Sequence, residues 1–575
     1  MGRTLLLILL FAFLSQALAQ DLHTCSMQGE HQRTYQNPLN EAWLSAYDVK
    51  HYDLSLAVSN QDTEISGEAA ILLEVRRNID TVVLELQSAL SVLEVRISER
   101  VSPFLFDREL SYAHEGDVLF IQLDRTRLAE ELFALKVVYE GDAGQNRGFY
   151  AGINNKTDSK YGFAVTYTLS EPNNARDWFP VKQVLEDKID SVTFRIRCDR
   201  RLLAASNGIL KEIERVGKEH IITWQTHYPM AYYLLSFAVA DYQDFSFMAG
   251  LSQAGDSVQI QNYIYDSKKV LNDWEDDIRA TGSMLSLFSR LLIDYPFKEE
   301  KYGHALAPMG GGIEHQTMTT LSDFNFYLVA HELAHQWFGD HITCGNWQDI
   351  WINEGFASYM EYVAAQQLRS QAAADAWMDN AMAIALGETK GSVFVPEEEL
   401  ENVNRLFDYG LSYKKGAILL HMIRFILDDD ALFFSILRNY LHLHGNGHAT
   451  GEDFKSTLEA ESGLDFSAFF EQWYYGEGYP RFEIHWKQQH DSVLIQSDQT
   501  GSASEVSPLF QVPFELELRF KNGSFRRLRL MQNRSREEFR IPVEGLVEDL
   551  IFDPDRHLLT TSHVSSEPIV NNPSN

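Results

Sequence analysis

Cysteine is scarce in this chain, which has three in 575 residues: Cys25, Cys198 and Cys344. Three thiols can form at most one internal disulfide, so a disulfide-stabilised scaffold is excluded. A zinc site built mainly from cysteines is excluded as well, so any firmly bound metal ion must be held by histidines and carboxylates. Cys198 falls on the apolar face of an alternating segment, where we expect a core residue.

Positive charge is also in short supply. Lysine and arginine together number 49 against 82 aspartates and glutamates, which gives a formal net charge of −33. Nucleic acids and anionic membrane surfaces are bound through clustered basic residues, so the composition argues against both as partners. A cationic ligand is compatible with this charge, although acidity also serves solubility.

Long apolar runs are missing except at the N-terminus, where Arg3 precedes the apolar segment Leu5–Leu14. The small residues Ala17 and Ala19 then stand at the spacing of a signal-peptidase site, so residues 1–19 are predicted to be a signal peptide cleaved after Ala19. The alternative is a membrane anchor, but a run of about 10 apolar residues is short for a bilayer core of about 30 Å. We therefore expect an exported chain, secreted or periplasmic, with no membrane span after cleavage.

The hydrophobic pattern changes twice along the chain. From about residue 45 to 245 apolar and polar residues alternate, as in strands with one buried face. Helical spacing follows from about residue 265, and alternation returns after the Gly476–Pro480 punctuation. The fold class predicted is multidomain α+β. Its parts are a signal peptide (1–19), an N-terminal β-sheet domain (20–245), a helix-rich domain (246–478), a small C-terminal β-sandwich (479–562) and a flexible tail (563–575).

One helical segment carries the motif His331-Glu332-Leu333-Ala334-His335. Residues four apart lie above one another on a helix, so both imidazoles can reach one metal ion. Glu332 is rotated by about 100° from His331 and can address a water molecule without ligating the metal. Ser322 or Asp323 is expected to cap this helix. The alternative is a surface helix with two solvated histidines, which predicts nothing special downstream.

Glu354 supplies the downstream signal. It follows His335 after 18 intervening residues and opens a second helical pattern. Two histidines and one glutamate leave the fourth position of a tetrahedral zinc ion open, which is typical of catalytic rather than structural sites. We therefore predict one catalytic Zn²⁺ per chain, with His331, His335 and Glu354 as its ligands.

These motifs resemble the gluzincin aminopeptidases, the aminopeptidase N and leukotriene hydrolase family. The resemblance covers about residues 45 to 560 and implies a thermolysin-like catalytic domain for residues 246–478. The matching segments are His331–His335, Asn353–Ala357, Gly311–His315 (similar to the Gly-x-Met-Glu-Asn exopeptidase motif), Tyr413–Gly416 (similar to Tyr-x-Lys-Gly) and Ser170–Pro180 (similar to the N-terminal-domain segment that reaches into the active site).

The chain departs from the family pattern in two respects. Ile313 and His315 replace the Met and Asn of the commonest exopeptidase motif. His315 resembles a Met-Glu-His variant of bacterial relatives, which keeps the amine-binding role. The sequence also ends after the small β domain, without the long helical domain that most relatives have, so we expect a more open active site.

The resemblance implies hydrolysis of the N-terminal peptide bond. Glu332 would act as general base, and the Tyr413 hydroxyl would stabilise the oxyanion. Tyr409 is a weaker candidate for the same role.

The substrates implied are peptides with a free N-terminal amine. Glu314 and Glu171 would bind the α-ammonium group through charge-assisted hydrogen bonds. Gly311 and Gly312 would let the backbone approach the substrate beside His315.

Three other functions are alternatives. A bifunctional epoxide hydrolase would need a lipid channel built partly by the helical domain that is missing here. A binding protein that had lost the chemistry would usually lack a ligand, the base or the tyrosine, and all are present. An endopeptidase needs a cleft open on both sides of the metal, and Glu314 argues against it.

Overall fold

The computed structural model describes residues 41–145, 151–252 and 255–566. The predicted signal peptide and Cys25 lie outside the described residues. Residues 567–575 of the predicted tail lie outside them as well. Export of the chain therefore stays a prediction. Among the described residues, no helix is both long and apolar enough to cross a membrane.

Internal contacts divide the chain into two compact units. The first comprises the described residues up to Asn346 together with residues 401–404 and 444–449, and the second comprises 347–400, 405–443 and 450 onward. The three domain boundaries predicted from the sequence stay predictions.

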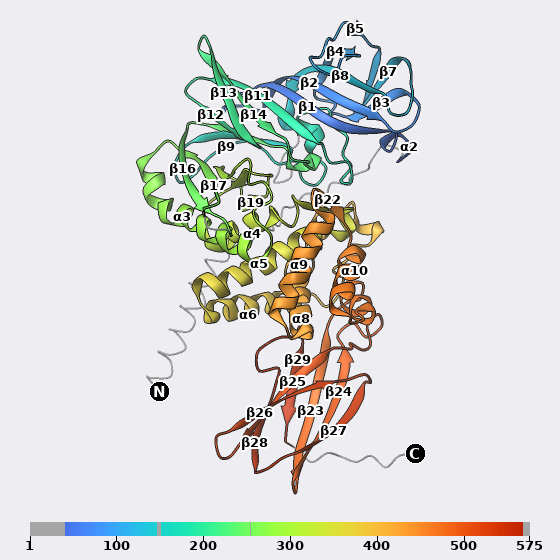
Figure 1. The fold of residues 1–575 in the computed structure, drawn as a ribbon, viewed down its shortest axis with the longest axis vertical. Helices are drawn as coiled ribbons and strands as arrows, with labels where there is room; N and C mark the ends of the chain where they lie inside the picture. Colours follow the sequence, from blue (N-terminus) through green and yellow to red (C-terminus); the bar gives the residue numbers. More distant parts are fainter. Residues whose placement is uncertain (1–40, 146–150, 253–254, 567–575) are drawn as a thin grey trace. The chain divides into compact units, whose positions relative to one another are not determined.

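The N-terminal part of the first unit is built from strands (Figure 1). They are β1 (Tyr47–Ala57), β2 (Glu64–Val75), β3 (Ile79–Glu85), β4 (Ser91–Ser98), β5 (Arg108–Glu109), β6 (Tyr112–Glu115), β7 (Val118–Arg127), β8 (Leu132–Asp142), β9 (Ile153–Thr157), β10 (Ala164–Thr168), β11 (Ser191–Asp199), β12 (Leu203–Ser206), β13 (Ile209–Val216), β14 (Glu219–Thr226) and β15 (Phe237–Ala240), preceded by the short helix α2 (Glu41–Leu44).

These strands form sheets of eight, four and three strands, in the orders β13-β14-β11-β1-β2-β8-β4-β5, β12-β15-β10-β9 and β3-β7-β6. In the largest sheet, β1 pairs with β2 in antiparallel and with β11 in parallel orientation, with Tyr52 opposite Val192. Tyr52, Leu54 and Leu56 are all buried, so the alternation in the sequence places one face of β1 in the core. Cys198 on β11 is buried too, as predicted.

The rest of the first unit combines a five-stranded sheet with two helices. Its elements are β16 (Tyr242–Gly250), β17 (Ser257–Tyr265), α3 (Lys268–Leu291), β18 (Tyr302–Leu306), β19 (Gly312–Ile313), β20 (Thr319–Leu321), α4 (Phe326–His335), β21 (Ile342–Cys344) and β22 (Gly447–Ala449).

Helix α4 carries the histidine motif. Its cap is Asn325, whose side chain accepts a hydrogen bond from the Tyr327 N–H, so the predicted cap at Ser322 or Asp323 was wrong.

The helices after residue 346 are α5 (Trp351–Ala364), α6 (Gln371–Gly387), α7 (Val403–Leu406), α8 (Gly416–Leu427), α9 (Asp430–His444), α10 (Gly451–Ser462) and α11 (Ser467–Phe469). A π-helical segment, Tyr409–Lys415, leads directly into α8. Helix α10 has a complete capping box, in which Thr450 and Asp453 satisfy each other's backbone N–H groups.

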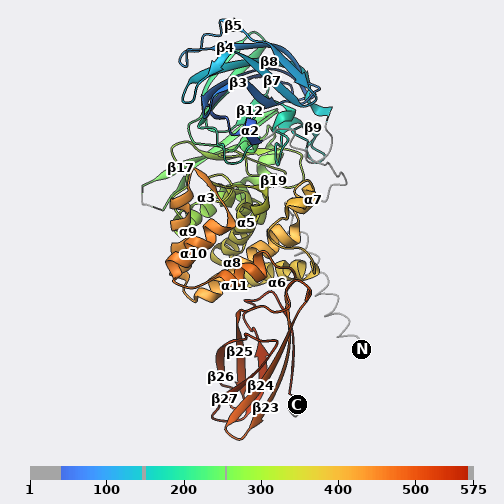
Figure 2. The ribbon, with the colours of Figure 1, turned by 90° about the vertical axis from the view of Figure 1, so that its right-hand side faces the viewer.

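The C-terminal strands are β23 (Pro480–Gln489), β24 (Ser492–Gly501), β25 (Pro513–Phe520), β26 (Phe525–Met531), β27 (Arg536–Pro542), β28 (Val547–Phe552) and β29 (Thr561–Ser565). They form one sheet in the order β27-β24-β23-β29 and another in the order β26-β25-β28 (Figure 2). The ring of Phe482 from the first sheet packs on Phe514 and Phe552 of the second, with centroids 5.5 and 5.0 Å apart. The predicted α+β class, with N-terminal sheets, a helix-rich part and C-terminal strands, is confirmed.

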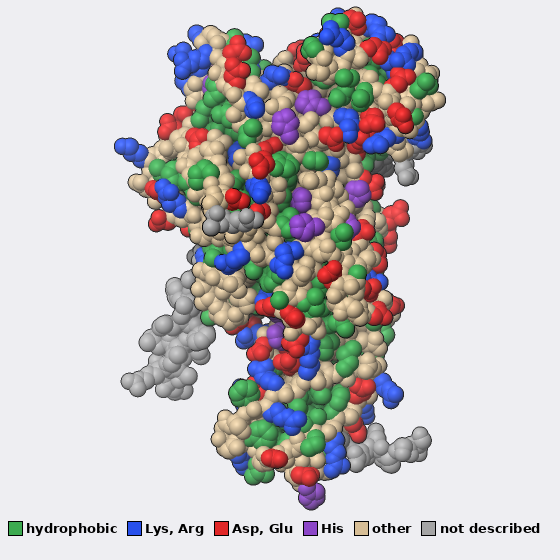
Figure 3. All heavy atoms as spheres, in the orientation of Figure 1, with side chains coloured by type: hydrophobic (Ala, Val, Ile, Leu, Met, Phe, Trp, Pro, Cys, Tyr) green, Lys and Arg blue, Asp and Glu red, His purple; other side chains and the backbone are tan. Residues whose placement is uncertain are grey.

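Charged side chains are mixed on the face of the molecule that Figure 3 shows. On the face shown in Figure 3, acidic side chains are interspersed with lysines and arginines rather than gathered into one patch. This distribution fits a role of the acidity in solubility.

Candidate metal centre

Helix α4 places its two histidines side by side. The rings of His331 and His335 have centroids 4.6 Å apart, and both residues are buried. The Nδ1 of His335 lies 3.0 Å from the Phe338 carbonyl oxygen. Because a carbonyl only accepts, Nδ1 carries the proton and Nε2 keeps its lone pair for a metal ion. The donor set of α4 therefore fits a metal ion of the zinc type.

Glu332 lies between these histidines in the sequence and is fully buried. Strand β19 runs close to it: a Cβ added to Gly312 would lie 2.6 Å from Glu332 Oε1. No side chain other than hydrogen fits there without moving the carboxylate. Gly312 thus has a role in positioning Glu332, in addition to the substrate contact expected from the sequence.

Glu314 directly follows β19, and its side chain lies close to Glu332 and His335. Ligand atoms of Glu314, Glu332 and His335 all lie within 4.8 Å of one another. The Tyr233 hydroxyl donates to Glu314 Oε1 at 3.2 Å. Gln336 holds the loop from the other side, since its Nε2 donates to the Glu314 carbonyl at 3.2 Å.

Glu171 comes from the N-terminal sheets and meets Glu314. Their carboxylate oxygens lie within 4.8 Å of each other, and both residues are buried. The Glu171 carbonyl accepts a hydrogen bond from Asn174 Nδ2 at 3.0 Å, and the next carbonyl, of Pro172, accepts one from the Tyr232 hydroxyl at 2.6 Å. Two buried carboxylates at this separation repel each other, so the pair favours a cation between them.

Three polar residues beside this cluster were not expected from the sequence. Tyr233 contacts Glu314, and burial followed by the charges of Glu314 and Glu171 raises the pKa of its hydroxyl, so it stays a donor. Gln336 directly follows the histidine motif, which is the one signal that could have identified it.

Asp340 is the third polar residue beside the cluster that was not expected from the sequence. Neither of its carboxylate oxygens has a hydrogen-bond partner among the described residues. Burial is the main cause that raises the pKa of Asp340. The nearby Lys188, which donates to the Asp340 carbonyl at 2.7 Å, has its pKa lowered to about 7 by burial.

His315 and Gly311 flank this cluster in the sequence. His315 is fully buried, its Nδ1 lies 2.9 Å from Thr320 Oγ1, and burial lowers the pKa of its imidazole to about 3. The ring is therefore neutral at neutral pH. Gly311 has a φ of 122°, a conformation that favours glycine, and its N–H donates to Ser322 Oγ at 3.2 Å.

The other predicted site residues belong to the second unit. Glu354 lies in the first turn of α5, and Tyr413 lies in the π-helical segment before α8; both are buried. The two segments touch through glycines, because a Cβ added to Gly355 would lie 3.0 Å from the backbone of Gly416. The glycines of Asn353–Ala357 and Tyr413–Gly416 therefore let the backbones carrying Glu354 and Tyr413 pack closely.

The first unit thus brings together five predicted site residues: His331, His335, Glu332, Glu314 and Glu171. The second unit holds Glu354 and Tyr413 on adjacent segments. That these two sets act on one metal ion stays a prediction from the sequence.

Two family models match the chain. The model described as the peptidase M1 N-terminal domain matches residues 48–234, and the one described as the peptidase family M1 domain matches residues 314–473. The second match includes Glu314, the histidine motif, Glu354 and Tyr413.

Curated relatives are aminopeptidases. Aminopeptidase 2 of Candida albicans is 25% identical over 457 residues, which cover 76% of this chain and 48% of the relative. Endoplasmic reticulum aminopeptidase 1 of Rattus norvegicus is 26% identical, with 79% and 50% covered. Aminopeptidase N of Lactococcus lactis is 34% identical over a shorter match, 32% of this chain and 22% of the relative. The chain spans about half the length of the first two.

A solved structure of similar extent shows the same fold. The M1 zinc metallopeptidase of Deinococcus radiodurans superposes with a TM-score of 0.61 at 23% identity, covering 73% of this chain and 91% of that one. A mutant of that protein, solved with a Tyr-Ser-Ala substrate, gives the same TM-score of 0.61.

The close approach of Gly312 to Glu332 can be tested by stability. Gly312→Ala forces a methyl group into the Glu332 carboxylate, so we expect the free energy of unfolding to fall by about 1–3 kcal/mol. Urea unfolding of the purified chain measures this. Gly250→Ala is the matched control, because a Cβ there meets nothing within 4 Å. Equal unfolding midpoints for the two variants would contradict the proposed contact.

Proposed function

The chain belongs to the peptidase M1 family, and from this we propose that it is a zinc aminopeptidase that hydrolyses the N-terminal peptide bond of peptides. The observation that carries the proposal is the buried pair Glu171–Glu314 in the same unit as the α4 histidines. Two neighbouring buried carboxylates, in the same unit as imidazoles suited to a metal ion, fit a substrate that carries its positive charge next to the scissile bond.

His331, His335 and Glu354 are the proposed ligands of the Zn²⁺ ion. When bound, such an ion polarises a carbonyl group and lowers the pKa of a water molecule. The proton of His335 Nδ1 is held by the Phe338 carbonyl, which orients the ring and leaves Nε2 toward the ion.

Glu332 is the proposed general base. Its carboxylate accepts the proton of the attacking water and can return it to the leaving amine. The lack of a side chain at Gly312 leaves room for this carboxylate beside β19.

Glu314 and Glu171 are proposed to bind the α-ammonium group of the substrate. Charge-assisted hydrogen bonds to both carboxylates would fix the register of the peptide, so that its first peptide bond is the one hydrolysed. The Tyr233 hydroxyl and Gln336 position Glu314 from two sides. His315 would lie beside the substrate as a neutral imidazole, with Gly311 and Gly312 admitting the backbone.

Tyr413 is proposed to donate its hydroxyl to the oxyanion that develops at the scissile carbonyl. Its place in the π-helical segment supports this, because such segments are frequent at functional sites. The Asp408 side chain accepts a hydrogen bond from the Leu411 N–H at 2.8 Å and so holds the start of this segment.

Replacing Glu332 separates the base from the ligands. Glu332→Gln should keep one zinc ion per chain and lower kcat by about 10²–10⁴, because the amide cannot take the proton. Zinc analysis and hydrolysis of aminoacyl anilides measure the two quantities. The exposed Glu299→Gln is the control and should leave both unchanged. Loss of zinc in Glu332→Gln would instead make Glu332 a ligand.

Replacing Glu314 tests the anchoring of the amine. Glu314→Gln should lower kcat/KM on free-amine substrates by about 10²-fold or more while zinc content stays unchanged, since the register of the substrate is lost. In the unaltered enzyme, N-acetylation of the same peptides should abolish cleavage. Efficient cleavage of acetylated peptides would support an endopeptidase and contradict the proposal.

Tyr413 has a natural control four residues away. The rings of Tyr409 and Tyr413 have centroids 5.8 Å apart, and Lys414 Nζ lies 4.8 Å from the Tyr409 ring centroid. Tyr413→Phe should lower kcat by about 10²–10³, the usual cost of losing one oxyanion donor. Tyr409→Phe should keep kcat within a few-fold of the original. The opposite ranking in anilide hydrolysis would move the role to Tyr409.

A further inference from the structure

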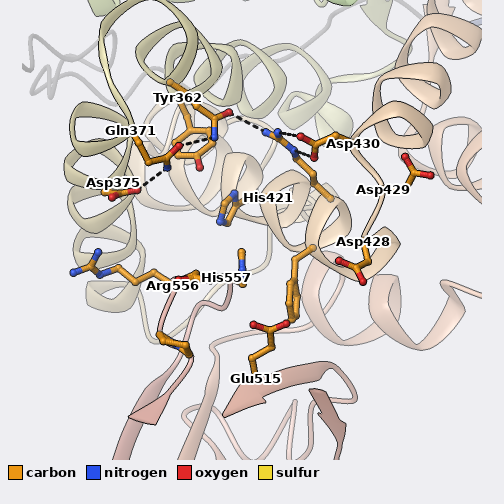
Figure 4. Close-up of a pocket in the computed structure, with 15 residues that line it drawn as sticks. Tyr362, Gln371, Asp375, His421, Asp428, Asp429, Asp430, Glu515, Arg556 and His557 are labelled. Carbon is orange, nitrogen blue, oxygen red and sulfur yellow. Dashed lines mark hydrogen bonds and ion pairs between the residues drawn. The ribbon is translucent and has the colours of Figure 1, made fainter. Parts of the chain in front are cut away.

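A polar cavity of about 640 Å³ lies within the second unit, where α6 and α8 meet the C-terminal strands (Figure 4). None of the residues proposed for catalysis lines it. Four of its lining side chains carry groups that can bind a metal ion. They are His421 from α8, Glu515 from β25, and Asp555 and His557 from the loop between β28 and β29.

Two histidines in this cavity have unused nitrogens. His421 is only 6% exposed. The Arg556 backbone interacts with its ring, but neither ring nitrogen has a hydrogen-bond partner of normal geometry among the described residues. The Nδ1 of His557 is buried and lacks a partner as well. Buried imidazoles normally have their donor and acceptor satisfied, so this pair suggests a missing ligand.

The two rings lie close to each other in the cavity, as Figure 4 shows. Their centroids are 5.6 Å apart and their planes differ by 31°. Two imidazoles bound to one tetrahedral zinc ion, with Zn–N bonds of about 2.0–2.1 Å, place their centroids roughly 5 Å apart. The His557 ring is held in this position by stacking on Phe425, at a centroid distance of 4.3 Å.

Two carboxylates complete the group. Ligand atoms of Glu515, Asp555 and His557 all lie within 4.8 Å of one another. Arg527 holds both carboxylates, with Nη1 2.8 Å from Asp555 Oδ2 and 3.3 Å from Glu515 Oε2. A carboxylate can accept about four hydrogen bonds or metal bonds, so Arg527 orients these groups without using up their acceptor capacity.

The loop that carries Asp555 and His557 is also fixed by its backbone. The Asp553 carboxylate accepts hydrogen bonds from the N–H groups of His557 and Leu558, both at 2.9 Å. The donors are therefore held in place without an ion.

We propose that this cavity binds a second divalent transition-metal ion. Glu515, Asp555 and His557, whose ligand atoms lie together, would supply three donors, and His421, whose ring lies beside that of His557, would supply the fourth. Imidazole nitrogens combined with carboxylate oxygens suit Zn²⁺ and similar ions, whereas Ca²⁺ and Mg²⁺ prefer oxygen donors alone. Four protein donors make a closed, structural site. Because the donors come from α8, β25 and the loop after β28, the bound ion would join the helices of the second unit to its β-sandwich.

Zinc titration of the full-length holoenzyme tests the proposal. After equilibrium dialysis against Zn²⁺, the original chain should hold one more ion than His557→Gln, counted by elemental analysis. Both chains keep the zinc ion of the proposed active site, so the difference in zinc content between them reports the second site alone. His563→Gln, an exposed histidine on β29, is the matched control and should bind as many ions as the original chain.

Asp555→Asn and His421→Gln provide independent checks if His557→Gln does not fold. Each should weaken the additional Zn²⁺ by about 10–100-fold or more. Added Zn²⁺ should also raise the Tm of the original chain and of His563→Gln but not that of the site variants. Equal zinc uptake by the original chain, Asp555→Asn and His421→Gln would overturn the proposal, as would uptake of an organic cation such as spermidine in place of Zn²⁺.

Discussion

The burial of charged groups beside α4 is the constraint on which the rest of the site depends. Glu171, Glu314, Glu332 and Asp340 are all removed from solvent around two buried histidines. Removing carboxylates from water is costly unless cations or hydrogen-bond donors compensate them. The fold supplies some compensation through Tyr233, Gln336 and Lys188, and the proposed metal ion and substrate ammonium would supply the rest.

Glycines make this dense arrangement possible. Gly312 brings β19 against the Glu332 carboxylate, and Gly355 and Gly416 bring α5 against the start of α8. In each case the glycine stands within three residues of a proposed functional residue in the sequence, because the backbone must come close where the side chain has to be placed accurately. In the cavity of the second unit, Arg527 and the turn at Asp553 hold the proposed metal donors instead.

Much of the architecture could be predicted from local patterns. The alternation in Tyr52, Leu54 and Leu56 predicted a strand with one buried face, and β1 has it. The spacing of His331 and His335 predicted adjacent rings because helix geometry alone brings them together. The helix cap was misplaced, since Ser, Asp and Asn all occur within a few residues and only the backbone selects Asn325.

By itself, the sequence determined the residue types, their spacing along each element and the resemblance that assigned roles to them. Those signals are local, because periodicity and motifs act over a few turns of helix or one strand. The resemblance predicted that Glu171 and Glu314 bind one group, and the structure brings their carboxylates together across 143 residues of sequence. Only the tertiary structure showed that Tyr233 supports Glu314 and that the His421 ring lies beside that of His557. Such contacts join residues far apart in the chain, and no local pattern encodes which distant side chains will share one buried space.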